Sequence, residues 1–158
     1  MGASPYTPSE STQLVVDING YFAAPASGGL SLHSAPPCRI IDTRNNNGQP
    51  FQGQLTVNVA GSPYAPSSSA QAYVLNATVV PPGPMHYVTP WPDPDQQPNV
   101  STLNAIDGYT TSNMAIVPNT NGSTDAFASD PTQLILDISR YFAPQYLAKT
   151  ALYGANVR

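Results

Sequence analysis

The chain has 158 residues, which is long enough for one folded domain with a terminal extension. Charged residues make up only 9%, against about 25% in an average soluble protein. The net charge is −4 with a single lysine, so the chain lacks the basic surface that nucleic acids and anionic membranes attract. We therefore expect no nucleic-acid partner. A hydrophobic content of 41% still predicts a folded core.

No stretch of the sequence approaches the roughly 18 consecutive apolar residues of a membrane helix, so we expect no membrane insertion. The first residues, Met1 to Pro5, lack the basic start of a signal peptide. Together these features predict a chain that is mature, excised or soluble as it stands.

Short apolar runs between turn clusters predict an all-β chain. No internal window repeats apolar residues at helical spacing, whereas residues 55–59 alternate with period two, as a half-buried strand does. Strand spacing of about 10 to 15 residues favours a β-sandwich, either jelly-roll or immunoglobulin-like. A short helix or a tail is expected at 145–153. In chain order, we expect strands at 30–32, 39–42, 55–59, 72–80, 87–91, 101–105, 113–117 and 123–128.

A twelve-residue segment occurs twice in the chain. TQLVVDINGYFA begins at Thr12, and TQLILDISRYFA begins at Thr132, 120 residues later. Eight of the twelve positions are identical, and two more exchange one aliphatic residue for another. Nothing else appears twice, so the chain is not a stack of small repeats. The simplest explanation is one full unit preceded by the last strand of another.

Both copies alternate in hydrophobicity, so each predicts a strand with one apolar face. We therefore divide the chain into an extension with an extended N-terminal strand (1–23), a sandwich module (24–143) and a tail (144–158). If the second copy completes the module, the first has no equivalent place within it. It could pack elsewhere in its own domain, pair with its twin, or join a neighbouring molecule by strand addition.

Strand addition between copies would build a filament or array, because a head-to-tail contact does not close on itself. The residues expected to make the exported strand are Leu14, Val16, Ile18, Tyr21 and Phe22. The receiving region is expected near their twins Leu134, Leu136 and Ile138.

Several motifs in fixed order resemble a known family. They include Pro36-Pro37-Cys38-Arg39-Ile40-Ile41-Asp42-Thr43-Arg44, residues 73–81, and the closing Leu134-Ile135-Leu136-Asp137-Ile138 with Tyr141-Phe142. Over about residues 24–143 the chain is similar to the β-rich repeat module of large secreted and surface proteins of soil bacteria, acidobacteria especially. The resemblance implies a tandem module outside the cell or on its surface, and it brings no activity. Relatives often carry a second cysteine near the position of Pro63 or Tyr64, which is absent here.

Catalytic residues are not apparent in the sequence, so we expect no enzyme, no cofactor and no metal. Cys38 is the only cysteine, which rules out an intrachain disulfide. It is expected to be an apolar filler, because a thiol nucleophile would need an imidazole and only His33 and His86 are present. An intermolecular disulfide is the alternative.

Two acidic motifs have a structural and a functional interpretation. In Asp42-Thr43-Arg44 the arginine could grip an anion, but Arg44 or Arg39 is expected to pair with a carboxylate at a strand end. Asp93-Pro94-Asp95, with Asp107, could bind calcium, although the spacing fits no EF-hand loop and is typical of turns.

Aromatic residues in the middle of the chain suggest a second hypothesis. Tyr87, Trp91 and Tyr109 could form a stacking surface for an extracellular glycan, or they could simply be buried. The function predicted first is an extracellular structural building block that associates with itself. The alternatives are a carbohydrate-binding or adhesive module and a passive spacer in a surface protein.

Overall fold

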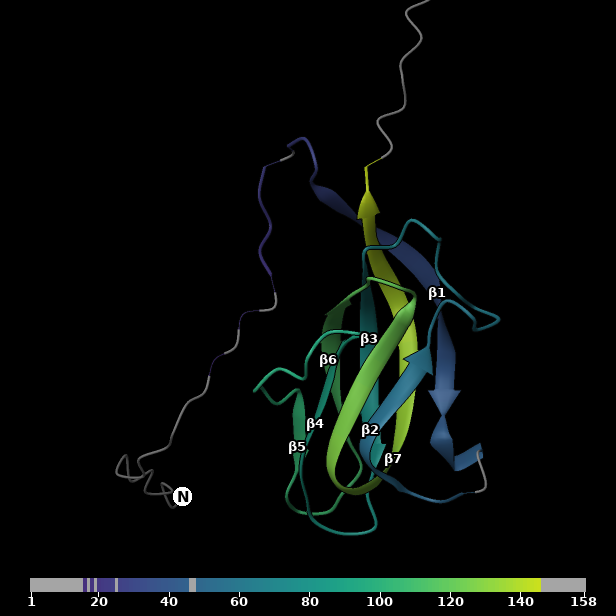
Figure 1. Cartoon of the computed structure of the whole chain (residues 1–158), viewed down its shortest axis with the longest axis vertical. Helices are drawn as coiled ribbons and strands as arrows, with labels where there is room; N and C mark the ends of the chain where they lie inside the picture. Colours follow the sequence, from purple (N-terminus) through teal and green to yellow (C-terminus); the bar gives the residue numbers. More distant parts are fainter. Residues whose placement is uncertain (1–15, 17, 19, 25, 46–47, 146–158) are drawn as a thin grey trace, which may run out of the picture.

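The computed structural model describes residues 16, 18, 20–24, 26–45 and 48–145 (Figure 1). One 3₁₀ turn, η1 (Thr43–Asn45), follows the first strand. The strands are β1 (Leu30–Asp42), β2 (Phe51–Asn58), β3 (Ala72–Val80), β4 (Met85–Pro92), β5 (Leu103–Ala105), β6 (Thr111–Pro118) and β7 (Ser123–Pro144). The expectation of an all-β fold is confirmed.

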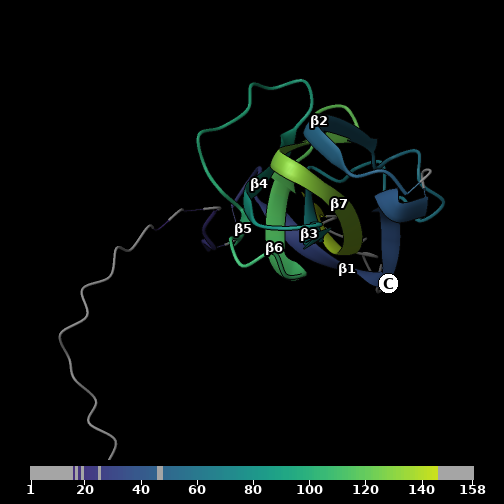
Figure 2. The same cartoon turned by 90° about the horizontal axis from the view of Figure 1, so that it is seen from below.

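The 22-residue strand β7 organises the whole fold because it belongs to two sheets. Its first half pairs with β2 and β4, and β4 pairs in turn with β5. Its second half pairs with β1 and β3, and β3 pairs with β6. All these pairs are antiparallel, and the curved strand wraps the two sheets toward a nearly closed barrel (Figure 2).

Two strands are longer than the sequence suggested. The runs at 123–128 and 132–143 join into β7 across Pro131, and the runs at 30–32 and 39–42 join into β1 across Pro36-Pro37. Proline lacks the N–H of a ladder, but it is tolerated at bulges and strand edges. β1 has a register shift between Ser34 and Cys38, at its prolines. Because β7 is shared by both sheets, which nearly close into a barrel, the expected sandwich is not confirmed.

The core lies between the two halves of the folded sheet. Alternation along β7 places Leu134, Leu136 and Ile138 on the inner face, where all three are fully buried. They pack with Leu75 and Val79 of β3 in one hydrophobic cluster. The face predicted from the sequence for this copy of the repeat is therefore the core face.

The described residues of the N-terminal repeat, which occupies 12–23, lie outside the seven strands. The extended strand expected there is thus absent at 16, 18 and 20–23, while 12–15, 17 and 19 lie outside the described residues. Of the expected C-terminal helix, only Gln145 is described, and it is not helical.

Candidate functional site: the open seam between β4 and β6

A groove follows the seam where the sheet stops short of closing, between β4 and β6. Its volume is about 450 Å³. No charged side chain lines it among the residues that the structure describes. One wall is the end of β4, from Pro90 to Pro92, and the other is β6 from Asn113 to Pro118. Loop residues Pro98 and 100–102 also line the groove. Ile18 of the N-terminal repeat lies at the same groove.

The β6 wall of the groove presents an unpaired strand edge. β6 pairs with β3 alone, and the ladder continues past its end, where Asn119 N donates to Gln71 O at 2.8 Å. Along an antiparallel strand, alternate residues direct both backbone groups toward the same neighbour. The odd-numbered residues therefore face β3, and Met114 and Ile116 direct their N–H and C=O groups toward the groove. Met114 N donates to Asn113 Oδ1 at 2.9 Å.

The β4 wall has the opposite character. Thr102 N donates to Val88 O at 3.0 Å, so Val88 faces away from β7. By the same alternation Pro90 and Pro92 lie on this side of β4, because the β4–β7 register has no shift between 88 and 92. Proline has no N–H, and prolines on a free edge oppose pairing with another strand. Of the two edges that border the groove, only β6 can accept a strand.

Side chains close one end of the seam. Asn113 Nδ2 of β6 donates to Thr102 O at 2.7 Å, across the gap to the loop before β5. Thr89 Oγ1 of β4 donates to Val100 O of the same loop. These contacts hold the loop against both walls, so the fold itself keeps the groove in shape. The open part of the groove lies toward Ile116.

The described residues of the N-terminal repeat lie near the open part of the groove, and their large apolar side chains are uncovered. Phe22 approaches Phe142 of β7 with ring centroids 6.4 Å apart. A smaller cavity of about 260 Å³ is lined by Gly20, Tyr21, Phe22, Ile116 and Phe142. Val16, Ile18, Tyr21 and Phe22 nevertheless remain between 72% and 90% exposed.

The region expected to receive the exported strand offers no free edge. Leu134, Leu136 and Ile138 lie in the half of β7 that pairs with β1 on one side and β3 on the other. Their side chains are completely buried. A central strand with two partners cannot accept a third, so this half of β7 cannot receive a strand.

The three aromatic residues expected at a sugar site do not share an exposed surface. Trp91 is only 4% exposed, and its Nε1 donates to Asp95 O at 2.9 Å. Tyr87 packs against Phe127 of β7 with ring centroids 5.7 Å apart. Tyr109 is exposed but belongs to the segment between β5 and β6. Trp91 therefore offers no exposed ring face for stacking, because its indole is part of the interior.

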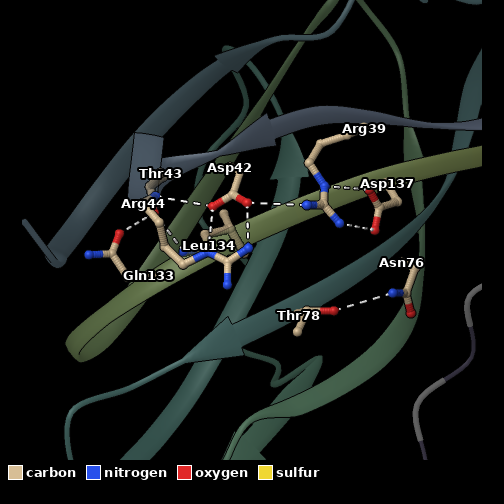
Figure 3. Close-up of polar contacts among 9 residues, drawn as sticks. All are labelled: Arg39, Asp42, Thr43, Arg44, Asn76, Thr78, Gln133, Leu134 and Asp137. Atoms are coloured by element: carbon tan, nitrogen blue, oxygen red, sulfur yellow. Dashed lines mark hydrogen bonds and ion pairs between the residues drawn. The ribbon is translucent and has the colours of Figure 1, made fainter. Parts of the chain in front are cut away.

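Asp42 joins the end of β1 to both neighbouring arginines (Figure 3). Arg44 Nε donates to Asp42 Oδ1 at 2.8 Å, and Arg39 Nη1 donates to Asp42 Oδ2 at 3.2 Å. The hydrogen bonds from Arg44 lower the pKa of Asp42 to about 2, although burial acts in the opposite direction. Arg39 also reaches across to β7, where its Nε donates to Asp137 Oδ1 at 2.9 Å. The structural interpretation of this motif is confirmed.

A buried hydrogen-bond network next to Asp42 was not apparent in the sequence. Thr43 Oγ1 contacts Gln133 Oε1 at 2.6 Å and accepts a hydrogen bond from Leu134 N at 2.9 Å. Gln133 Nε2 donates to Gly48 O at 2.9 Å. The network ties η1 and the following turn to β7, and it gives Gln133 a structural role.

Cys38, His33 and His86, the residues considered as nucleophile and bases, make structural contacts. Cys38 Sγ lies 3.9 Å from Tyr64 O, and the His33 ring stacks on Tyr141 at 5.2 Å. His86 Nδ1 lies 2.9 Å from Asp130 Oδ2, and Ser129 Oγ lies 2.7 Å from the same oxygen. Because the carboxylate lies between the hydroxyl and the imidazole, this trio does not place the imidazole against the serine as a catalytic triad does.

The acidic residues considered for calcium are engaged in turns. Asp93 Oδ2 accepts a hydrogen bond from Asn121 Nδ2 at 2.7 Å, and Asp107 Oδ1 accepts one from Tyr109 N at 3.1 Å. Within the described ranges, no three His, Cys, Asp or Glu side chains gather as metal ligands would.

Comparison with known proteins finds no matching protein family, no matching curated protein and no matching solved structure. Among the residues that the structure places, no helix is long and apolar enough to span a membrane. The seam and the N-terminal repeat are therefore the features of the molecule that bear on its function. The sequence does contain one overlooked signal for the seam, since prolines two residues apart within β4 mark the side of that strand that has no partner.

Proposed function

We propose that this chain is an extracellular structural building block that joins copies of itself through its N-terminal repeat. The observation that carries the proposal is a difference between twin residues. Ile138 of the second copy is 0% exposed in the core, whereas Ile18, at the equivalent position of the first copy, is 87% exposed. The apolar segment is thus buried in its second copy, whereas the described apolar residues of its first copy are exposed.

Covering this segment would contribute a substantial part of the free energy of association. Full burial of a large apolar side chain contributes about 1.5–3 kcal/mol. Val16, Ile18, Tyr21 and Phe22 are four such side chains, all mostly exposed in the single chain. Association also costs rotational and translational freedom, so backbone hydrogen bonds from strand addition would be needed together with this burial.

The second copy of the repeat already occupies its position in the fold, as the second half of β7. β7 continues from its first half, which β2 and β4 hold, into the half that β1 and β3 hold. Replacing that half by a neighbour's repeat would require breaking both ladders. Addition of the repeat to a free edge is therefore favoured over strand exchange. The extracellular setting is supported by the resemblance to surface-protein modules and by the lysine-poor composition.

The proposal is tested by comparing the full chain with its Ile18→Asp variant. We expect the full chain to form oligomers or fibres in light scattering and negative-stain electron microscopy, and Ile18→Asp to remain monomeric. Ser27→Asp is the matched control, because it adds the same charge at an exposed position just beyond the repeat. A full chain that stays monomeric at all concentrations contradicts the proposal and favours a passive spacer.

A second candidate function has one supporting observation. A cavity of about 520 Å³ is lined by Tyr87 with the polar side chains of Gln97, Asn99, Ser101 and Asn104. Amide groups beside an aromatic ring suit a sugar, so an adhesive role at this cavity is the alternative. A glycan panel tests it, and binding should be lost in Asn99→Ala, which removes an exposed side chain.

A further inference from the structure

We infer that the open edge of β6, with the groove beside it, is the site that accepts the N-terminal repeat of a second copy of this chain. This inference rests on the proposed function and names the partner surface that the function requires. It replaces the buried region around Leu136, which has no free edge.

The other outer edges of the fold are poorer acceptors. β1 contains Pro36-Pro37 and two register shifts, which disrupt regular pairing. β5 has only three residues. β2 has an irregular register at Gly53, and its outward side chains are polar, with Gln52, Gln54 and Thr56 exposed. β6 offers eight residues in unbroken register with β3.

The β6 edge offers both parts of a strand-addition site. Ile116 directs its N–H and C=O toward the groove, where they have no strand partner in the described part of the chain. Beside this edge the groove is lined by the apolar side chains of Val100, Met114 and Ile116. Val100 and Met114 are exposed in the single chain. Backbone groups would give affinity, and the groove would take alternate apolar side chains of the repeat.

Exposed apolar residues also border the groove itself. Outside the N-terminal repeat, seven large hydrophobic residues are exposed among those described. Two of the seven, Val100 and Met114, line the groove from its two sides. Neighbouring exposed apolar residues mark an interaction surface more often than single ones do.

Charge is compatible with self-association at this site. Two copies with a net charge of −4 each repel one another at long range. The groove itself has no charged lining residue in the described chain, and Asp17 is the only charged residue in the repeat. The contact would therefore bring together the least charged surfaces of the two molecules.

The occupant that the structure favours is a second copy rather than the chain's own repeat. The chain's own Ile18 lies at the groove but remains 87% exposed, and its described neighbours form no strand with β6. In the described part of the chain the β6 edge is therefore unpaired, although Ile18 and residues 20–22 lie beside it. Because donor and acceptor are different surfaces, each added copy exposes a fresh edge, and the assembly grows head to tail.

Cysteine pairs in a Cys38→Ser background test the site directly, since Cys38 is the only native cysteine. Ile18→Cys chains are mixed with isotopically labelled Met114→Cys chains under mild oxidation, and mixed dimers are recognised by mass. The matched control is Gln54→Cys on the exposed edge of β2. We expect several-fold more mixed dimer with Met114→Cys than with Gln54→Cys. Equal yields, or a preference for β2, overturn the inference.

A double Ile18→Cys/Met114→Cys chain separates the two possible occupants. Linkage between chains supports a second copy, whereas a predominant crosslink within one chain assigns the edge to the chain's own repeat and overturns the inference. Ile116→Pro gives an independent measurement, because it removes an N–H that faces the groove and leaves the β3 ladder intact. We expect assembly to be lost with little change in Tm, and if this variant fails to fold the cysteine comparison decides.

Failure of this inference is distinguishable from failure of the proposed function. If Ile18→Asp abolishes assembly but crosslinks do not favour Met114, the repeat is a donor and the acceptor lies elsewhere. If the full chain never assembles, both statements are wrong.

Discussion

The thiol of Cys38 on β1 lies 3.9 Å from the backbone oxygen of Tyr64, in the loop between β2 and β3. Tyr64 is one of the two positions, with Pro63, near which the resemblance to bacterial repeat modules implies a second cysteine. Tyr64 is largely exposed, so its side chain does little to hold the loop. The loop is thus placed against β1 by the fold itself, without the covalent link.

Tyr64→Cys should form a disulfide with Cys38 under oxidising conditions. The two positions are 26 residues apart in sequence, and closing a loop of this length stabilises a fold by about 3 kcal/mol in the chain-entropy account. We expect loss of both free thiols in a thiol titration and a higher Tm than in Tyr64→Ser. Two titratable thiols in the oxidised variant would contradict the prediction.

Twin positions of the repeat should respond in opposite ways to one substitution. Ile138→Ala removes fully buried atoms from the core and should cost about 2–5 kcal/mol of unfolding free energy. Ile18→Ala alters a side chain that is 87% exposed and should change the stability of the single chain by less than about 0.5 kcal/mol. Urea unfolding at dilutions where the chain is monomeric measures both. Similar costs would mean that the repeat is docked in solution.

The stability should fall in acid because two carboxylates have lowered pKa values. The pKa values of Asp42 and Asp130 are about 2, against an ordinary value of 3.8. Their stabilising contribution is therefore fully present above about pH 4–5 and is lost as pH falls toward 2. Urea unfolding at pH 7, 5 and 3 should show a flat region and then a decline.

The variant Asp42→Asn isolates one of these groups. It should reduce stability at pH 7 by about 1–3 kcal/mol, because it weakens the charged hydrogen bonds from Arg39 and Arg44. It should also make the decline between pH 5 and 3 shallower than in the parent chain. An unchanged acid profile would show that Asp42 does not control this part of the pH dependence.

Gly108 should tolerate no side chain. Its φ of +75° is unfavourable for other residues, and a Cβ there would lie 2.9 Å from the backbone carbon of Gly83. Gly108→Ala should therefore lower stability by more than about 1 kcal/mol. Gly83→Ala is the control, since a Cβ at that position meets nothing within 4 Å. Equal melting temperatures for the two variants would contradict this account.

Much of the fold could be predicted from the sequence because local alternation is sufficient for it. The expected strand at 72–80 is β3, and the alternating run 134–138 places its odd and even residues on the faces that the structure shows. The pairing of an arginine with Asp42 also follows from short-range spacing, because Arg44 is two residues away. Each of these features depends on neighbours along the chain.

Long-range pairing decided the rest. Two runs separated by Pro131 became one strand because β2 and β4 hold its first half and β1 and β3 hold its second half. Trp91 became part of the interior for the same reason, as no local pattern shows which face of β4 is covered. The pairing of β7 on both edges, with β6 left open, likewise depends on which strands meet.

The sequence by itself determined that the chain contains one apolar segment twice. Only the tertiary structure decided that Ile138 is buried while Ile18 is exposed, because burial depends on the partners that surround a strand and the two copies have different partners.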